Sequence, residues 1–403
     1  MAKRVEQIRG PFDPQGQPNF DSQNSVYLGV FAWNLAGGGA PTIAVMEDPE
    51  RRRDYWQWPA ASHLIKEADR IGCEFQVPFG RWLGHGGITE YNENTLDFLT
   101  VAAGLAPLTS NILLPSTAHI GYQHHPVQFA KWGAAIDHMS DGRWGLNIVA
   151  GWIRDEVEMF GETFMDHDLR YDVCDEFVTF MKHCWYADEP FDFEGDYFTG
   201  KDIWVTPKPS RKPRPVLVNA GYSPAGMDFA TKHCDWLFAA NPSGDPQDLG
   251  DVANRAKEQA EKYNRQVRVM SFCYCIWEET DEKAEILLAE QQGMMDELAT
   301  SWHLYRGLDQ PGTKTGASFS LPLGGETATL KQAVGAENFV RYGLGIAGRQ
   351  IVGGYDSVAE HIRMLHTDYG QEGQLFCWLD PLRGIHQLED HIIPRLRKMG
   401  LRK

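Results

Sequence analysis

Residues 116–171 decide the fold, and they read STAHIGYQHHPVQFAKWGAAIDHMSDGRWGLNIVAGWIRDEVEMFGETFMDHDLRY. An apolar run that ends at Thr117 precedes a helical pattern over about 126–139, and Asp141-Gly142 then turns the chain into a second apolar run, WGLNIVAG. Both runs are continuously apolar rather than alternating, which is typical of parallel strands covered by helices on both faces. The stretch therefore predicts a strand–helix–strand unit of an α/β protein.

The same alternation continues on both sides of this unit. Further apolar runs of strand length are VYLGVFAW (26–33), CEFQVPF (73–79), PRPVLVNAG (213–221), DWLFAA (235–240), VRVMSFCYCIW (267–277) and QLFCWLD (374–380). Most of them are followed by a helical pattern, including one over about 282–305. Eight strands in this alternation predict a closed (β/α)8 TIM barrel rather than an open sheet.

The ends of the chain and one late segment depart from this pattern. Residues 1–24 are polar and rich in Pro, Gly, Asn and Gln, and we expect an N-terminal arm that packs on a partner subunit or stays loose. Residues 25–400 are expected to form a single barrel domain. Within it, the segment of about 306–350 is too long for an ordinary loop, so we expect an insertion or a mobile lid. FDFEGDYFT (191–199) predicts either a short hairpin or an excursion at the edge of the sheet.

The composition excludes several classes of protein. A net charge of −17 argues against a nucleic-acid partner and against an anionic membrane surface. No apolar run approaches membrane-spanning length and the first residues lack a signal-peptide core, so a cytoplasmic enzyme is expected. The seven scattered cysteines indicate reduced core residues rather than disulfides.

Polar residues at the ends of the expected strands are candidate ligand-binding groups. Asn147 lies within an apolar run, where an unpaired amide would cost about 1–3 kcal/mol, so it bonds either to its surroundings or to a ligand. Thr117 stands at the end of its strand, where the ligands of such folds collect. Gly221-Tyr222-Ser223-Pro224 follows a strand and opens a helix. Helix capping alone would explain that sequence, but the same arrangement is also a ready phosphate site.

The order of these motifs resembles the bacterial luciferase-like flavin monooxygenases. The resemblance rests on T-x-H, D-H-x-S-x-G-R, N-x-V-x-G-W and H-D-x-R-Y, and it is strongest toward the branch holding pyrimidine and dimethylsulfone monooxygenases. It implies a barrel with a late insertion that forms a homodimer or homotetramer. It also implies that reduced FMN, supplied by a separate NAD(P)H:flavin reductase, is used with O2 to oxidise a small organic substrate and cleave a C–S, C–N or related bond.

The resemblance also assigns roles to individual residues. Thr117 and Asn147 would lie beside the flavin ring, where two neutral donors favour oxygen transfer over loss of hydrogen peroxide, and Trp152 would wall the substrate pocket. The remaining cofactor-binding residues would be Val77 and Pro78 beside the ring, Arg170 and Tyr171 toward the phosphate and ribityl chain, and Gly221, Tyr222 and Ser223 at the phosphate.

Other readings stay open. A deazaflavin-dependent oxidoreductase of the same fold, a non-catalytic flavin-binding protein, and a metal hydrolase using His124 or His125 each fit part of the pattern. Because no carboxylate or further histidine falls at ligand spacing, His119, His124 and His125 are expected to be solvated loop residues, with no metal. A solvated face is likewise expected for Asp155, Glu156 and Glu158.

Overall fold

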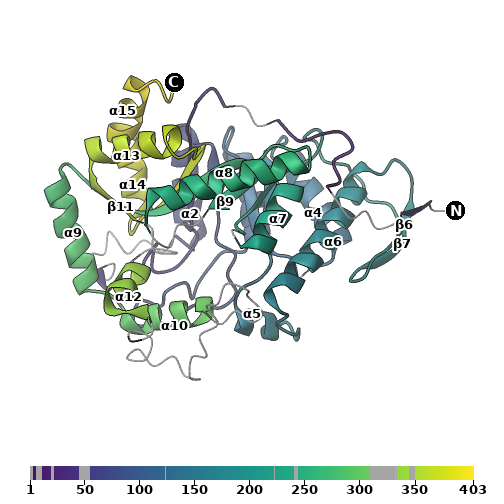
Figure 1. Cartoon of the computed structure of the whole chain (residues 1–403), viewed down its shortest axis with the longest axis horizontal. Coiled ribbons are helices and arrows are strands. Elements are labelled where there is room, and N and C mark those ends of the chain that lie inside the picture. Colours follow the sequence, from purple (N-terminus) through teal and green to yellow (C-terminus); the bar gives the residue numbers. More distant parts are fainter. Residues whose placement is uncertain are drawn as a thin grey trace.

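A computed structural model (Figure 1) describes residues 3–5, 11–19, 22–44, 55–122, 124–221, 223–239, 244–308, 332, 334–344 and 350–403. Its main sheet contains β2 (Tyr27–Phe31), β3 (Phe75–Val77), β4 (Leu114–His119), β5 (Trp144–Val149), β8 (Val216–Asn219), β9 (Trp236–Ala239), β10 (Arg268–Glu278) and β12 (Gly373–Cys377). These strands are parallel and follow the order β3-β2-β12-β10-β9-β8-β5-β4.

The ring closes between its first and last strands. Leu113, just before β4, donates its backbone N–H to Glu74 O at 2.9 Å, and Gln76 N donates back to Leu113 O at 3.2 Å. All eight strands were expected from their apolar runs, so the prediction of a (β/α)8 barrel is confirmed.

Helices cover the outside of this barrel (Figure 1). They are α2 (Trp58–Arg70), α3 (Phe98–Leu105), α4 (Pro126–Met139), α5 (Arg154–Met159), α6 (His167–Tyr186), α7 (Pro224–His233), α8 (Pro246–Lys262), α9 (Asp281–Gly293), α10 (Glu297–Leu308), α12 (Ala336–Gly343), α13 (Tyr355–Thr367), α14 (Pro381–Gln387) and α15 (Ile393–Lys398), with the short 3-10 helix η1 (Ala106–Leu108) and the π-helix η3 (Leu388–Ile392). Several begin with Pro in the first turn after a capping side chain, as at Ser223 and Asp245, which fixes where the helix starts.

Large side chains fill the barrel interior. Phe31, Phe75, Trp236, Phe238 and Phe272 belong to one buried cluster, separate from the cluster between the sheet and the helices. Their rings pack closely, with the Phe31 and Phe238 centroids 4.8 Å apart. Because side chains fill the interior, we expect a ligand to bind at the mouth of the barrel, where the carboxyl ends of the strands lie.

Tertiary contacts divide the helix expected over about 282–305 into α9 and α10. Ile43 N donates to Met294 O at 2.7 Å, and Asp296 N donates to Pro41 O at 2.8 Å. The loop after β2 therefore forms hydrogen bonds with backbone groups that would bond within the helix if it were continuous. Asp296 then accepts from Ala299 N and caps the second helix. The single long helix was therefore wrong.

A further strand, β11 (Gln350–Gly354), was not expected. It pairs in parallel with the second half of β10, from Tyr274 to Glu278, outside the eight-strand order. Its short, glycine-containing sequence gives a weak strand signal. It follows the expected insertion, most of which lies outside the described residues.

The N-terminal residues that the structure describes pack on their own chain. β6 (Phe191–Glu194) and β7 (Thr199–Ile203) form the expected antiparallel hairpin, and β1 (Lys3–Val5) adds to it in parallel. Phe12 stacks on His183 with ring centroids 3.9 Å apart. The division into an arm and one domain over 25–400 stays a prediction. Within the described ranges, no helix has the length and apolarity that crossing a membrane requires.

Candidate active site

Thr117 and Asn147 are paired at the mouth of the barrel. They lie opposite each other in the register of β4 and β5, and Asn147 Nδ2 donates to Thr117 Oγ1 at 3.1 Å. Both are buried, yet Asn147 Oδ1 has no hydrogen-bond partner among the described residues. A buried amide oxygen left without a donor costs about 1–3 kcal/mol, so this atom fits a ligand donor at the strand ends.

The end of β3 lies against the same pair. Val77 closes β3 and Pro78 follows it, and both side chains are buried. Gly80 follows two residues after Pro78, and a Cβ added to it would lie 2.5 Å from Thr117 O. The chain after β3 can therefore approach β4 this closely only with glycine, and this contact brings Val77 and Pro78 to the Thr117 side of the mouth.

The start of α7 forms a narrow cradle. Ser223 Oγ accepts from Gly226 N at 3.1 Å and lies 3.3 Å from His167 Nε2, while Gly221 N donates to Asn219 Oδ1 at 2.7 Å. A Cβ on Gly221 would lie 2.5 Å from Tyr171 Oη, so the cradle has no room for a side chain there. Backbone N–H groups of a helix start, a phenol and a histidine suit a phosphate. Tyr222 lies outside the described residues.

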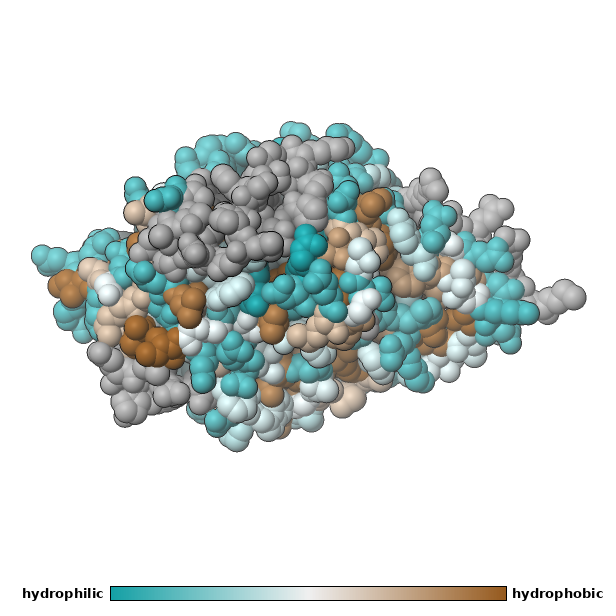
Figure 2. Space-filling model, turned by 90° about the horizontal axis from the view of Figure 1, so that it is seen from below, coloured by the Kyte–Doolittle hydropathy of each residue, from teal (hydrophilic) through white to brown (hydrophobic). Residues whose placement is uncertain are grey.

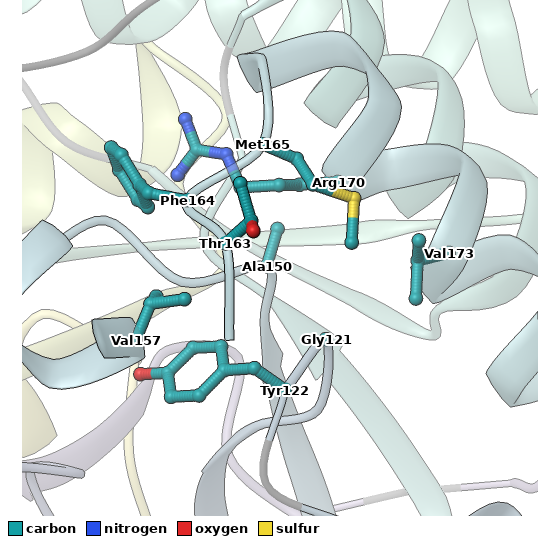
Figure 3. Close-up of a pocket in the computed structure, with 9 residues that line it drawn as sticks. All are labelled: Gly121, Tyr122, Ala150, Val157, Thr163, Phe164, Met165, Arg170 and Val173. Carbon is teal, nitrogen blue, oxygen red and sulfur yellow. The ribbon is translucent and has the colours of Figure 1, made fainter. Parts of the chain in front are cut away.

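Arg170 and Tyr171 point to different places. Whereas Tyr171 reaches the start of α7, Arg170 is buried and donates through Nη1 to Gly151 O. Its guanidinium lies 4.5 Å from the Phe164 ring, and burial lowers its pKa. Figure 3 shows it beside Phe164 at a hollow whose other side carries Tyr122. Tyr171 is thus at the cradle, and Arg170 supports the loop after β5.

Trp152 forms part of a wall built from three segments. Its ring lies 4.7 Å from the Arg81 guanidinium, which belongs to the loop after β3, and its centroid is 6.2 Å from that of His303 on α10. Arg81 also lies 4.5 Å from the Phe79 ring. The loop after β3, the loop after β5 and α10 therefore meet at Trp152.

Glu156 does not lie on a solvated face, and that expectation was wrong. Its side chain is 0% exposed, and Oε1 accepts from Trp82 N at 2.8 Å and Leu83 N at 3.1 Å. Burial alone would raise the pKa of Glu156, but contact with His119 and the charge of Arg81 outweigh it and hold the pKa at about 2. The carboxylate therefore stays charged and fixes the loop after β3.

The three histidines lie in different environments. His119, at the end of β4, is buried, with Nδ1 2.8 Å from Tyr122 Oη and 3.3 Å from Glu156 Oε2, so a solvated position was wrong for it. His124 is half-buried, and burial lowers its pKa to about 4. Only His125 is exposed, where it caps α4 by accepting from Val127 N. Among the residues with described positions, no three His, Cys, Asp or Glu side chains gather as metal ligands would.

A second polar group adjoins this wall through His303. His85 Nε2 is 3.2 Å from His303 Nδ1, and Arg306 Nε donates to Asp155 Oδ2 at 3.1 Å. Sequence reasoning missed this group, together with Arg81 and Glu156. For Arg81, His85, Asp155 and Glu156 the available signal was their position soon after β3 or β5, where barrel enzymes place their functional residues. His303 and Arg306 lie on α10, far from the preceding strand, and gave no such signal.

Comparison with known proteins gives this arrangement a family. The luciferase-like monooxygenase family matches residues 44–372. Pyrimidine monooxygenase RutA of Cronobacter sakazakii is 32% identical over 337 residues, which cover 83% of this chain and 94% of that protein. The protein of the same name from Escherichia coli is 31% identical over 337 residues, covering 83% of this chain and 88% of that one.

Solved structures share the fold at lower identity. Riboflavin lyase RcaE, solved with modified FMN and riboflavin, aligns with a TM-score of 0.81 at 19% identity over 94% of this chain and 93% of that one. DmoA from Hyphomicrobium sulfonivorans aligns with a TM-score of 0.74 at 18% identity over 94% and 90% of the two chains. This chain belongs to the luciferase-like monooxygenase family and is a flavin-dependent monooxygenase.

Proposed function

We propose that this enzyme uses reduced FMN, supplied by a separate NAD(P)H:flavin reductase, and O2 to oxidise a small organic substrate with cleavage of a C–N, C–S or related bond. The observation that carries the proposal is the Thr117–Asn147 pair, whose free amide oxygen faces no donor among the described residues at the strand ends. Its support comes from the family and from relatives named pyrimidine monooxygenase.

The cofactor would be held along one side of the mouth. The turn before α7, at Gly221 and Ser223, with Tyr171 beside it, would hold the phosphate, and Tyr222, which lies outside the described residues, stays a predicted cofactor-binding residue. Thr117 and Asn147 would contact the ring, with Val77 and Pro78 as an apolar wall and Arg170 supporting the segment between them. When bound, the flavin supplies the electrons that activate O2.

The chain's own task is to position groups and exclude water. The bond from Asn147 Nδ2 to Thr117 Oγ1 fixes both side chains before any ligand arrives, so no reorganisation is needed during the reaction. The side chains that fill the barrel interior form the floor of the site, and Trp152, with Arg81 and His303 beside it, shields one side from water. A dry site of this kind strengthens each hydrogen bond to a reacting atom.

The test mixes the protein and reduced FMN with oxygenated buffer in a stopped-flow instrument, with and without uracil or dimethyl sulfone. We expect flavin reoxidation kinetics that differ from those of free FMN, and less hydrogen peroxide per O2 consumed when the right substrate is present. Reoxidation identical to free FMN with every substrate would contradict the proposal. Hydride transfer without O2 consumption would instead support a deazaflavin-dependent oxidoreductase. Flavin binding without either reaction would support a non-catalytic flavin-binding protein.

A further inference from the structure

Asn34 is a buried amide that fixes a distant backbone segment. It is 0% exposed, and its Nδ2 donates to Phe79 O at 3.0 Å and to Leu96 O at 3.2 Å, while its Oδ1 accepts from Phe79 N at 2.7 Å. An amide offers two N–H groups and one oxygen, and all of these are engaged here. The side chain therefore binds the N–H and the C=O of Phe79 together, as a neighbouring strand would.

This amide continues the pairing of β2 with β3 beyond the point where their backbones separate. The register of the two strands ends at Phe31 and Val77, and Ala32 N still donates to Val77 O at 3.1 Å. Ala32 adopts a left-handed conformation, with φ 51°, which turns the chain, and Pro78 has no N–H to donate. A side chain that carries both a donor and an acceptor replaces the missing backbone partner, and Asn34 is that side chain.

The opposite side of the same segment has weaker support. Pro115 of β4 lacks an N–H, and Gln76 Nε2 instead donates to Pro115 O at 3.3 Å. Farther along, Gly80 packs on Thr117, since an added Cβ would lie 2.5 Å from Thr117 O. Van der Waals contact is individually weak, so we expect the hydrogen bonds from Asn34 to do most to keep residues 78–80 in place.

These contacts join Asn34 to the polar pair at the mouth. Phe79 lies directly before Gly80, which packs on Thr117. Thr117 Oγ1 in turn accepts from Asn147 Nδ2 at 3.1 Å. In the proposed function, this pair contacts the flavin ring and the residues at the end of β3 form an apolar wall beside it. A shift of about 1 Å in such a site can cost roughly 10²-fold in rate, so the spacing between the wall and the pair must be fixed.

We propose that Asn34 is a positioning residue for the flavin ring. It holds residues 78–80 against β4, so that the wall after β3 and the hydroxyl of Thr117 keep a fixed spacing. Its effect passes through the backbone of Phe79, and it takes no part in the reaction itself. This inference rests on the proposed function, because the ring site belongs to that function.

The experiment measures flavin binding rather than turnover. Riboflavin, which carries the ring without the phosphate, and FMN are titrated separately into the full chain and followed by flavin fluorescence. Asn34→Leu removes all three hydrogen bonds at nearly constant volume, and we expect both flavins to lose affinity equally, by about tenfold or more. In the flavin-free chain, the Phe79 N–H should exchange with deuterium at least about tenfold faster, because it loses its acceptor.

A second variant tests the path through residues 78–80. Gly80→Ala forces the same segment away from Thr117 without changing Asn34, so it should weaken both flavins to a similar extent. The double variant should weaken riboflavin by much less than the product of the two single losses, because the segment is already displaced. A residue that only stabilises the fold would give independent effects. If Asn34→Leu does not fold, Asn34→Asp replaces it, since that variant keeps the bond from Phe79 N and loses the two that Nδ2 donates.

The matched control is a buried amide elsewhere in the barrel. Gln374 on β12 is 0% exposed, and its Oε1 accepts from Ser271 Oγ at 3.0 Å. Gln374→Met should lower the free energy of unfolding in urea while leaving both flavin affinities unchanged. Unchanged riboflavin affinity in Asn34→Leu, an equal loss in Gln374→Met, or fully independent effects of Asn34→Leu and Gly80→Ala would each overturn the inference. The expected losses without oxygenation of any substrate would support it and contradict only the proposed reaction.

Discussion

Asn147 Nδ2 lies 3.1 Å from Thr117 Oγ1 across two adjacent parallel strands, and this bond leaves Asn147 Oδ1 as a buried atom without a donor among the described residues. The neighbouring Ser116 shows the contrast. Its hydroxyl donates to Phe98 O and accepts from Trp144 Nε1, so it is fully used by the fold. One face of β4 is therefore structural, and the other is available to a ligand.

Asn147→Ala should separate flavin binding from productive oxidation. The substitution removes the free amide and the bond that orients Thr117, so we expect FMN still to bind while product per O2 falls roughly 10²-fold and hydrogen peroxide rises in its place. Product, O2 and hydrogen peroxide are measured in the same reaction. Ser116→Ala is the control and should keep normal coupling. Normal coupling in Asn147→Ala would remove this residue from the oxygen site.

Gly221→Ala should weaken FMN far more than riboflavin. The new methyl would lie 2.5 Å from Tyr171 Oη and 2.7 Å from Asn219 Oδ1, so one of these groups must leave the cradle. Because only FMN carries the phosphate, fluorescence titration should show a loss of at least about tenfold for FMN and little change for riboflavin, as removal of one charge-assisted bond predicts.

Ser223→Ala is the matched variant in the same turn. It removes the bond that Ser223 Oγ accepts from Gly226 N and should cost about 1 kcal/mol of stability, but the backbone N–H groups remain and FMN affinity should be nearly unchanged. If both flavins lose affinity equally in Gly221→Ala, the start of α7 does not hold the phosphate.

The barrel was predictable because each strand is a continuous apolar run. That pattern follows directly from burial on two faces, and it located all eight strands of the ring. The break between α9 and α10 was not predictable, because it depends on hydrogen bonds from Ile43 and Asp296 to residues distant in the sequence. Helical periodicity reports one face of a helix and cannot reveal such competition for its backbone.

The site was predictable in part for the same reason. Thr117 and Asn147 stood out as polar residues within apolar runs. Glu156 did not stand out, because Asp155-Glu156 looks like the exposed first turn of a helix. The backbone N–H groups that bind its buried carboxylate belong to Trp82 and Leu83, more than seventy residues earlier in the sequence. Tertiary contacts, rather than local pattern, decide whether such a carboxylate is solvated.

Asp13→Asn should destabilise the whole barrel. Asp13 binds Arg214 Nε at 2.6 Å and Lys182 Nζ at 3.2 Å and also pairs with Arg265, and these three cations are buried. Loss of the negative charge leaves part of this positive charge uncompensated, which typically costs about 3–5 kcal/mol. The free energy of unfolding is measured in urea.

The control for this substitution is Asp188→Asn, at an exposed position, which should change stability by less than about 0.5 kcal/mol. Equal losses in the two variants would mean that Asp13 is not the counter-charge that the buried cations require. Asp235, which pairs with Arg214 at 2.7 Å, would then have to compensate them alone.

His183 should make stability fall in mild acid. Burial lowers its pKa to about 4, its side chain stacks on Phe12, and its Nε2 has no partner among the described residues. The unfolded chain takes up the proton near pH 6.5 and the folded chain only near its lowered pKa, so stability is full above pH 6.5 and declines as the pH falls. Between pH 7 and pH 5 this single group should cost about 2 kcal/mol.

His183→Phe tests this contribution, since the ring can still stack on Phe12 but cannot take a proton. Urea unfolding at pH 7 and pH 5 should show a loss of stability about 2 kcal/mol smaller than in wild type, the amount that the lowered pKa predicts. His63→Phe, at an exposed position on α2, should leave the pH dependence as it is. An identical pH dependence in His183→Phe and wild type would show that His183 is protonated in the folded protein at pH 5, and that the contact with Phe12 does not exclude the charged form.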